Sequence, residues 1–531
     1  MLTSNSLAEC IEAIKDITEN NNVKALISSR PTPECVAAFG TSPQVKLQDL
    51  TKADITSYVL DVIGNQPCAK DLATRYPKEF AEIIYDVAQK ADGVFLWVVL
   101  ACRALKFGLE DSDRIKELQR LVDGLPPELE DMFRQMLAKT RSHHKEQGAK
   151  LLRICYEASA ISRQELSASS GRLSSTVLAV PLSKMNENLT EITEEAWSFP
   201  VRGDLACAEI EGRLRSRTGG LLEITSTPTG TPGSQYHTCR VIFMHRSVFD
   251  FLNNDNIWHL EDLEISDKQF DAAAALSLLC LFNAVAEVRG EYAEEESAHV
   301  GGHGTTTSML QSLDSGLAWG AKADAAGYLQ RNNIFWHFRR FLDSIPTPDP
   351  TSNPWDDDPS SALSSYRCSH TLHPAMILAA EFGAVIFMKQ NSLALAELKG
   401  PRPSCNCKPL LHCAVDRDFD RLVDRKTPAH QNCGDTIRFL LAVGCDANEP
   451  RNLLSPWDGW MKLVCKYNTA IHSDDNDFTD IDPGCVDYWV LDVTRAFIGA
   501  GVDLTSSARM LLAAVFGRSL SVKLLLEAGR L

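Results

Sequence analysis

Arg30 ends an apolar run that could place its side chain in a ligand site. Residues 23–31 read "VKALISSRP": a strand-like stretch over 23–27 runs into two serines and Arg30, and Pro31 stops it. In α/β sheets, ligands bind beyond the carboxyl ends of the strands. A guanidinium group can bind two phosphate oxygens at once. The pattern therefore predicts a strand over 23–27 and makes Arg30 a candidate ligand-binding residue.

A second group of chemically capable residues consists of Cys405, Cys407, His412 and Cys413. Thiolates and imidazoles at such short spacings are the ligands of structural zinc. The alternative is that His412 lies in the first helix of a repeat and fixes the preceding turn, while the cysteines fill a core. Because one histidine cannot do both, we favour the structural interpretation and expect no metal site.

Signatures of known enzyme classes are missing from the sequence. There is no Gly-x-Ser-x-Gly, no His-Glu-x-x-His and no kinase signature set, and no Gly-Lys dipeptide that could belong to a phosphate loop. The glycine-bearing segments at 218–225 and 301–307 do not join a strand to a helix, so we expect loops there. The sequence predicts a protein that is not an enzyme and has no cofactor.

Length, net charge and cysteine content limit the number of domains, the kinds of partner and the location of the protein. The 531 residues exceed what one core usually organises, which predicts several domains. A formal net charge of −17 argues against nucleic acid or an anionic membrane as the main partner. No apolar run reaches the roughly 20 residues of a membrane-spanning helix. The 16 scattered cysteines, with no secretory signal before them, indicate reduced thiols and a cytoplasmic location.

Apolar spacing predicts mostly helices. An N-terminal helix precedes the strand at 23–27, and four helices follow it between residues 49 and 141, the first starting at a capping-box pattern of Thr51 and Asp54. Two further strands are expected at 220–225 and 239–245, the second leading into a helix at 247–252. The segment 343–361 is rich in Pro, Ser and Asp and indicates a linker.

Past the linker, short segments recur. Residues 378–383, 411–418 and 511–517 share paired small residues, and several later segments share an apolar pair leading to a glycine. A segment of the first type combined with one of the second type resembles an ankyrin repeat, which is a helix pair that stacks on its neighbours. The spacing is irregular, so we expect an ankyrin-like region. The alternative is a helical domain without repeats, in which Ala and Leu recur by chance.

The order of segments up to about residue 140 carries a second resemblance. "VKALISSRP", "VKLQDLTKADITSYV", "KADGVFLWVVLACRALKFGL" and "LPPELEDMFRQML" follow one another as in the C-terminal half of the NACHT module of fungal NOD-like, signal-transducing NTPases. The resemblance implies a phosphate-sensor role for Arg30. Since the phosphate loop and the magnesium-binding strand are missing, we expect Arg30 to be vestigial and to make a structural ion pair.

Residues 241–252, "VIFMHRSVFDFL", resemble a strand-to-helix segment that follows the NACHT helices in these fungal proteins. In related switches, a histidine after a methionine contacts bound ADP. Met244 and His245 are similar to that pair, although Arg246 stands where the family has aspartate. The alternative gives His245 a buried hydrogen bond to the backbone at the strand end, and we favour it over nucleotide binding.

Together these patterns predict a mainly α-helical chain that keeps the remnant of an α/β P-loop NTPase domain. We expect a remnant of the α/β core at 1–48, a helical lid at 49–125, a winged-helix-like and helical domain at 126–345, a linker at 346–369 and an ankyrin-like region at 370–531.

The expected function is non-catalytic protein interaction within a truncated NOD-like receptor, in fungal nonself recognition or cell-death signalling. The partner would be a protein bound through the ankyrin-like region, with full-length NACHT relatives as one candidate. The alternative is an ATP-binding ATPase whose phosphate-loop half is encoded upstream. A decaying paralogue without function is a third possibility.

Overall fold

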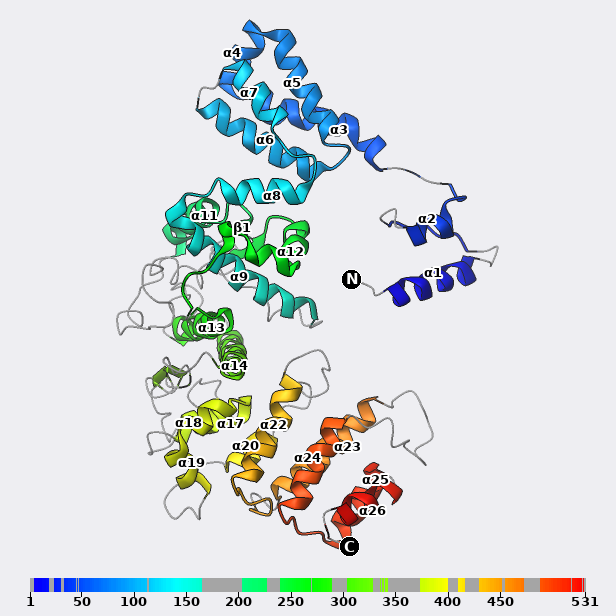
Figure 1. Cartoon of the computed structure of the whole chain (residues 1–531), viewed down its shortest axis with the longest axis vertical. Helices are drawn as coiled ribbons and strands as arrows, with labels where there is room; N and C mark the ends of the chain where they lie inside the picture. The colour runs from blue at the N-terminus through cyan, green and yellow to red at the C-terminus, as the bar shows by residue number, and fades with distance from the viewer. Residues whose placement is uncertain are drawn as a thin grey trace. The chain divides into compact units, whose positions relative to one another are not determined.

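The chain is mainly α-helical, as its sequence predicted. The computed structural model describes residues 4–18, 23–29, 33–43, 45, 47–111, 114–164, 203–226, 239–268, 270–288, 303–327, 335, 337, 338, 340, 341, 373–399, 409–415, 429–450, 454–471, 488–516, 518–527 and 529. These residues form two compact units, Met1–Arg134 and Gln135–Leu531 (Figure 1). Within the described ranges, no helix is long and apolar enough to span a membrane.

The strand predicted over 23–27 does not form. Residues 23–29 have no regular structure and lie between helices α1 (Ser4–Thr18) and α2 (Pro33–Phe39). None of them is buried, and Leu26 is 103% exposed. A strand needs a neighbour to accept its backbone hydrogen bonds and a layer to cover its apolar face. The prediction was wrong because the described part of this unit offers neither.

The rest of the first unit is a helical bundle, as the periodicity predicted. Its helices are α3 (Leu47–Gly64), α4 (Pro67–Arg75), α5 (Pro77–Lys90), α6 (Phe95–Glu110) and α7 (Ile115–Asp123). The stripe of α5 is buried from Phe80 to Val87, and Trp97 of α6 donates its indole N–H to the Pro126 carbonyl at 2.7 Å. The expected cap at Thr51 was wrong, because α3 begins at Leu47, one turn earlier.

Helix α8 (Leu129–Ala138) contains the division between the two units. Beyond it lie α9 (Ser142–Gln164), α11 (Gly203–Arg217), strands β1 (Leu222–Ser226) and β2 (Cys239–Phe243), α12 (Arg246–Leu252), 3₁₀ turns η3 (Asp255–His259) and η4 (Glu261–Leu263), and α13 (Ala272–Val288). The two strands pair antiparallel, with Leu222 opposite Phe243. Both expected strands form, and the loop predicted at 218–225 was wrong from Leu222 onward, because β1 begins there and pairs with β2. Helices α11, α9 and α12 pack around the pair.

The remaining helices are α14 (His303–Ala325), α17 (His373–Phe382), α18 (Val385–Gln390), α19 (Ser392–Lys399), α20 (Leu410–Val415), α22 (Ala429–Ala442), α23 (Pro456–Ile471), α24 (Tyr488–Gly499), α25 (Ser506–Phe516) and α26 (Arg518–Glu527). Helix α14 packs along α13. The loop predicted at 301–307 was wrong from His303 onward, because α14 begins there. A helix can start at glycine-bearing sequence when it packs on a neighbour, because most helical stability comes from tertiary packing.

From α17 onward the helices form consecutive pairs: α17 with α18, α20 with α22, and α25 with α26 (Figure 1). Helix α23 pairs with α24 through the ring contacts of Trp457 and Trp460 with Phe497. The first helices of the pairs contact one another in sequence, and so do the second helices. We call this arrangement the helix-pair stack. Its centre is aromatic: Trp460 lies near Trp489 and Phe497 and donates its N–H to the Thr494 hydroxyl at 3.1 Å.

A buried carboxylate connects α14 to this stack. Asp324, which is 1% exposed, accepts hydrogen bonds from the N–H groups of Ile386 and Phe387 at 2.8 and 2.9 Å. These amides lie in the first turn of α18 and have no acceptor within their own helix. Burial raises the pKa of Asp324 to about 6, although the two hydrogen bonds and Lys389 oppose the rise.

This pKa predicts a pH-dependent stability. Because the folded pKa of about 6 exceeds the unfolded value of about 4, the folded chain takes up the proton more readily. Stability from this group is therefore complete below about pH 4 and is lost as pH rises to about 6. Asp324→Asn removes the titrating group but keeps an acceptor for only one of the two N–H groups. Its unfolding free energy should therefore lack the fall that the parent shows between about pH 4 and pH 6.

Denaturant unfolding of the second unit between pH 4 and 7 checks this expectation. The difference between Asp324→Asn and the parent should grow with pH, because only the parent carries the titrating carboxyl group. Parallel curves for the parent and Asp324→Asn would contradict the assignment.

Gly219, in the turn before β1, predicts a second effect on stability. Its φ is +61°, and a Cβ would lie 2.7 Å from the Met136 carbonyl oxygen. Gly219→Ala should destabilise the second unit by about 1–3 kcal/mol, because both the backbone conformation and the backbone contact oppose a side chain. Gly212→Ala is the matched control: nothing lies within 4 Å of its Cβ position in α11, so it should leave stability equal or higher. Equal unfolding free energies for the two variants would refute this account.

Candidate functional site

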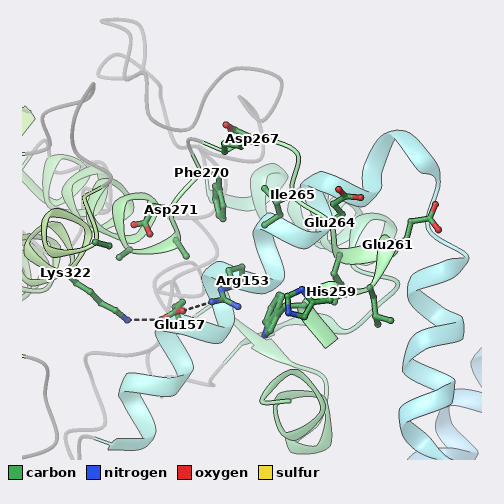
Figure 2. Close-up of a pocket in the computed structure, with 17 residues that line it drawn as sticks. Arg153, Glu157, His259, Glu261, Glu264, Ile265, Asp267, Phe270, Asp271 and Lys322 are labelled. Carbon is green, nitrogen blue, oxygen red and sulfur yellow. Dashed lines mark hydrogen bonds and ion pairs between the residues drawn. The ribbon is translucent and has the colours of Figure 1, made fainter. Parts of the chain in front are cut away.

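A pocket of about 740 Å³ lies in the second unit, between α9, η3, η4, the start of α13 and α14 (Figure 2). Its lining is rich in charge of both signs: Arg153, Glu157, Glu261, Glu264, Asp267, Lys268, Asp271 and Lys322. Trp258, Ile265 and Phe270 supply the apolar part of the wall. Helix α9 positions Arg153 and Glu157 on one face because they stand four residues apart.

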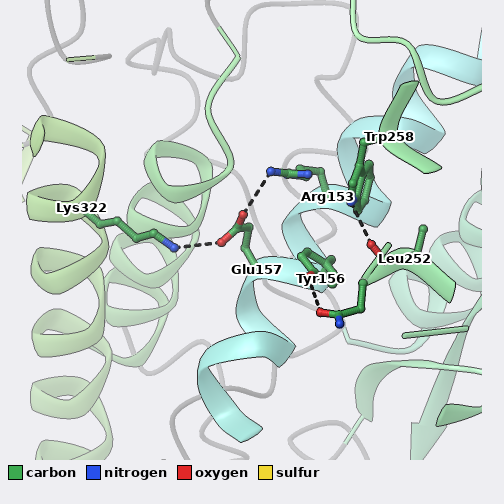
Figure 3. A network of polar contacts seen from close by, with 7 residues as sticks. Arg153, Tyr156, Glu157, Leu252, Trp258 and Lys322 are labelled. Atoms are coloured by element: carbon green, nitrogen blue, oxygen red, sulfur yellow. Dashed lines mark hydrogen bonds and ion pairs between the residues drawn. The ribbon is translucent and has the colours of Figure 1, made fainter. Parts of the chain in front are cut away.

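Glu157 is the centre of the charge arrangement (Figure 3). Its carboxylate lies 2.9 Å from Nζ of Lys322 on α14 and 3.5 Å from Nη2 of Arg153 on its own helix. The three side chains form a row from α14 across to α9 (Figure 3). Since Glu157 is only 20% exposed, the two cations offset the cost of burying its charge.

Arg153 also stacks on an aromatic wall. Its guanidinium carbon lies 4.6 Å from the centre of the Trp258 ring, within the range of a cation–π interaction. Trp258 is held by its N–H, which donates to the Leu252 carbonyl at 2.9 Å, and the Tyr156 hydroxyl lies 2.9 Å from Oδ1 of Asn253 (Figure 3). Arg153 is therefore fixed from two sides, by a carboxylate and by an indole.

Asp271 caps the start of α13 inside the pocket. Its carboxylate accepts the Ala274 N–H at 2.7 Å. Burial raises the pKa of Asp271, and the nearby Glu157 adds to the rise, whereas the Ala274 amide and Lys322 lower it. The carboxyl thus has an ordinary structural role at a helix N-terminus.

Carboxylates of this pocket form ion pairs with cationic side chains around it. Lys150, beside it, contacts Asp267 at 3.0 Å and Glu146 at 3.4 Å, so a second set of charges is also matched. A catalytic site needs a nucleophile or general base directed at an open reacting position. Here Glu157, Arg153 and Lys322 are engaged with one another. Among the described residues, no cluster of His, Cys, Asp and Glu could hold a metal ion.

A second candidate surface is the edge where the loops of the helix-pair stack lie. We define the loop edge as residues 443–450, after α22, and 500–505, after α24. Asn448 joins the two loops: its Nδ2 donates to the Gly501 carbonyl at 3.2 Å, and its Oδ1 accepts the Asp503 N–H at 2.8 Å. Asp446 and Asp503 are exposed on either side. Asp446 also accepts the Asn448 N–H at 2.8 Å through its Oδ1, so it helps to order its own loop. The two loops are thereby held in register with exposed carboxylates on both.

The nucleotide-site candidates from the sequence are not brought together. Arg30 lies outside the described residues. His245 stands at the N-cap of α12, where its Nδ1 accepts the Ser247 N–H at 3.1 Å. The favoured backbone hydrogen bond exists, but His245 is exposed, so the expectation of burial was wrong. The short helix turns away immediately after β2, which leaves the imidazole at the surface.

His412 behaves as a structural residue. It is buried, and its Nε2 lies 2.8 Å from the Glu449 carbonyl oxygen at the loop edge. The favoured interpretation placed its bond in the preceding turn, whereas the bonded loop lies 37 residues later. Cys413 is buried beside it, and Cys405 and Cys407 lie outside the described residues. Helix pairing brings the later loop back to His412.

Sequence analysis missed Asn448 and the row of charged side chains formed by Arg153, Glu157 and Lys322. Asn448 follows Gly444 in "GCDAN", and Asp503 follows Gly501 in "GVDL", so the shared Gly-x-Asp pattern was a usable signal. No local signal marked Glu157, because Lys322 stands far along the chain.

Comparison with known proteins matches one part of the chain. A family model described as a domain of unknown function (DUF7791) matches residues 141–291. That span includes α9, β1, β2, α12 and α13, and it supplies most of the pocket wall, while Lys322 lies beyond it. No curated protein and no solved structure gave a significant match.

The hydrogen bonds of Asn448 predict a local effect. Asn448→Ala removes the acceptor of the Asp503 amide and a donor to Gly501, so exchange of the Asp503 amide should accelerate at least tenfold. Hydrogen exchange followed by mass spectrometry of peptides covering 500–505 measures it. Asn65→Ala is the control, since Asn65 lies in the other unit and donates to the Asp61 carbonyl of α3. Unchanged exchange in 500–505 would show that Asn448 does not hold the loop edge.

Proposed function

We propose that this chain works by binding another protein through the loop edge of the helix-pair stack. The observation that carries the proposal is the bridge made by Asn448, which fixes two successive loops relative to each other. A surface whose loops are already ordered loses less conformational entropy on binding. Stacked helix pairs generally present such extended surfaces to partners.

The exposed charge suggests the partner's chemistry. Asp446 and Asp503 face outward from neighbouring loops, and the chain as a whole carries a net charge of −17. Complementary charge accelerates encounter and excludes wrong partners. The partner should therefore present a basic surface to the loop edge.

The sequence resemblances give this binding a context. The stack is the region that resembles ankyrin repeats, and the preceding segments resemble the C-terminal half of a fungal NACHT module. We infer a non-catalytic member of the NOD-like signalling class, with a role in nonself recognition or cell death. A full-length relative is one protein that could carry the basic surface.

Site-specific photo-crosslinking tests the proposal. A photoreactive amino acid is placed at Asp446 or Asp503 of the full chain, expressed in its own organism, and at Asp435 as a control. Asp435 is the same residue type, exposed on α22 away from the loops. The same partner should be captured from 446 and 503, and Asp446→Lys should reduce its capture at 503.

Three results would count against the proposal. Equal capture from Asp435 would mean that the loop edge has no special role. Capture at 503 that persists in Asp446→Lys would remove the charge argument. Magnesium-dependent retention of labelled ATP by the purified chain would contradict the non-catalytic interpretation.

A further inference from the structure

The pocket between α9 and α14 plays no part in the proposed function, and its size suits a small organic molecule. Its volume of about 740 Å³ falls within the roughly 300–1,000 Å³ of most ligand sites. Such sites combine an apolar wall with a few polar groups that fix the ligand's orientation. The arrangement of charge around this pocket therefore indicates which class of molecule it can hold.

Arg153 is a positioned guanidinium group with donor capacity left for a ligand. It stacks on Trp258 at 4.6 Å, and its Nη2 lies 3.5 Å from the Glu157 carboxylate. Within the described part of the chain this is its one ion pair, and 36% of the side chain is exposed. A guanidinium group has five N–H donors in a plane that matches a carboxylate. Arg153 can therefore bind an anionic group from the pocket while Trp258 and Glu157 hold it in place.

Lys322 adds a second cation to the same wall. Its Nζ donates to Glu157 at 2.9 Å, and an ammonium group has three donors. Two cations share this one carboxylate, so the row of Arg153, Glu157 and Lys322 has one positive charge in excess. Asp271 lies nearby, but it accepts the Ala274 N–H, and burial raises its pKa, which disfavours the charged form. This end of the pocket is suited to an anionic group.

The other end of the pocket has the opposite excess. Glu261, Glu264 and Lys268 line it and are exposed, and none of them forms an ion pair with another residue that the structure describes. Two carboxylates and one ammonium leave one negative charge in excess. Figure 2 shows Glu261 and Glu264 on the side of the pocket away from Lys322. This end is suited to a cationic group.

Apolar side chains lie between the two charged ends. Figure 2 shows Phe270 and Ile265 in the middle of the pocket wall. Asp267 belongs to the same stretch, but Lys150 neutralises it at 3.0 Å and also lies 5.5 Å from the centre of the Phe270 ring. The middle of the pocket is therefore neutral and offers an apolar surface to a ligand.

We propose that this pocket binds a zwitterion with an apolar body, namely an amino acid or short peptide with free amino and carboxyl groups. The ligand's carboxylate binds Arg153 and Lys322, its ammonium group lies at Glu264, and its apolar side chains contact Phe270 and Ile265. Both terminal groups of a peptide are mostly charged at pH 7. The inference goes beyond the proposed function, because it concerns a small ligand at a different site.

Ligands with charge of one sign fit the pocket less well. A polyanion such as a nucleotide would meet a lining in which carboxylates outnumber cations. A polyamine would meet the cationic row on α9 and α14. Like charges brought together in a pocket repel, whereas a zwitterion places each of its groups opposite its complement.

Isothermal titration calorimetry of the full chain tests the proposal with trileucine as the probe. Saturable one-to-one binding is expected. Carboxyl-amidated trileucine and N-acetylated trileucine each lack one terminal charge, so each should bind at least tenfold more weakly. Titration with leucine distinguishes the two sources of the zwitterion: tighter binding of leucine indicates a free amino acid, and tighter binding of trileucine indicates a peptide.

Variants test which protein group binds each end. Arg153→Met should weaken trileucine binding at least tenfold and abolish the further loss caused by amidation, because the carboxylate has lost its partner. Glu264→Gln should likewise abolish the loss caused by acetylation. Arg215→Met and Glu211→Gln are the matched controls, since these two residues form an exposed i,i+4 ion pair on α11, as Arg153 and Glu157 do on α9. The controls should leave the affinity unchanged.

Three results would overturn the inference. The first is no saturable binding of either trileucine or leucine, and the second is equal affinity for free and terminally blocked trileucine. The third is a loss of affinity in Arg215→Met as large as that in Arg153→Met. The blocked peptides are tested on the parent chain, so a variant that fails to fold does not leave the question open. Photo-crosslinking at the loop edge is measured separately, so either proposal can fail without the other.

Discussion

Burial of one apolar helix face against a neighbouring element is the constraint on which this structure depends. A helix with an apolar stripe gains little by itself, and most of its stability comes from the surface it covers. In the stack, each pair covers the stripe of the pair before it, as Gly434 shows by its approach to α24. The same requirement explains the bundle around α5, whose stripe is fully used.

The segment 23–29 contains apolar side chains that are not buried. Its composition suits a buried strand, but Leu26 and Ile27 are exposed, because among the described residues no sheet or helix covers them. Helix α26 presents the opposite case: it is well formed, but its Val522 and Leu526 are exposed. In both places the apolar side chains are suited to a covering layer.

Polar groups join the elements that apolar burial brings together. Asp324 satisfies two amides of α18, Asn448 joins two loops, and Glu157 connects α14 to α9. Each polar group is matched where it lies, since a buried polar group without a partner is costly. These contacts set the register of helices whose packing alone would tolerate small shifts. The proposed binding surface depends on that register, because it holds the loops in a row.

Periodicity was sufficient to predict a mainly helical chain, the stripe of α5 and the two strands that pair as β1 and β2, because these depend on residues close in sequence. The placement of His412 in a helix followed from the same local pattern. The contact of His412 with Glu449, the row through Lys322 and the exposure of Val522 and Leu526 could not be predicted. Each depends on what lies across the fold: α22 carries the same kind of stripe as α26, and only the packed neighbour makes one a core and the other a surface.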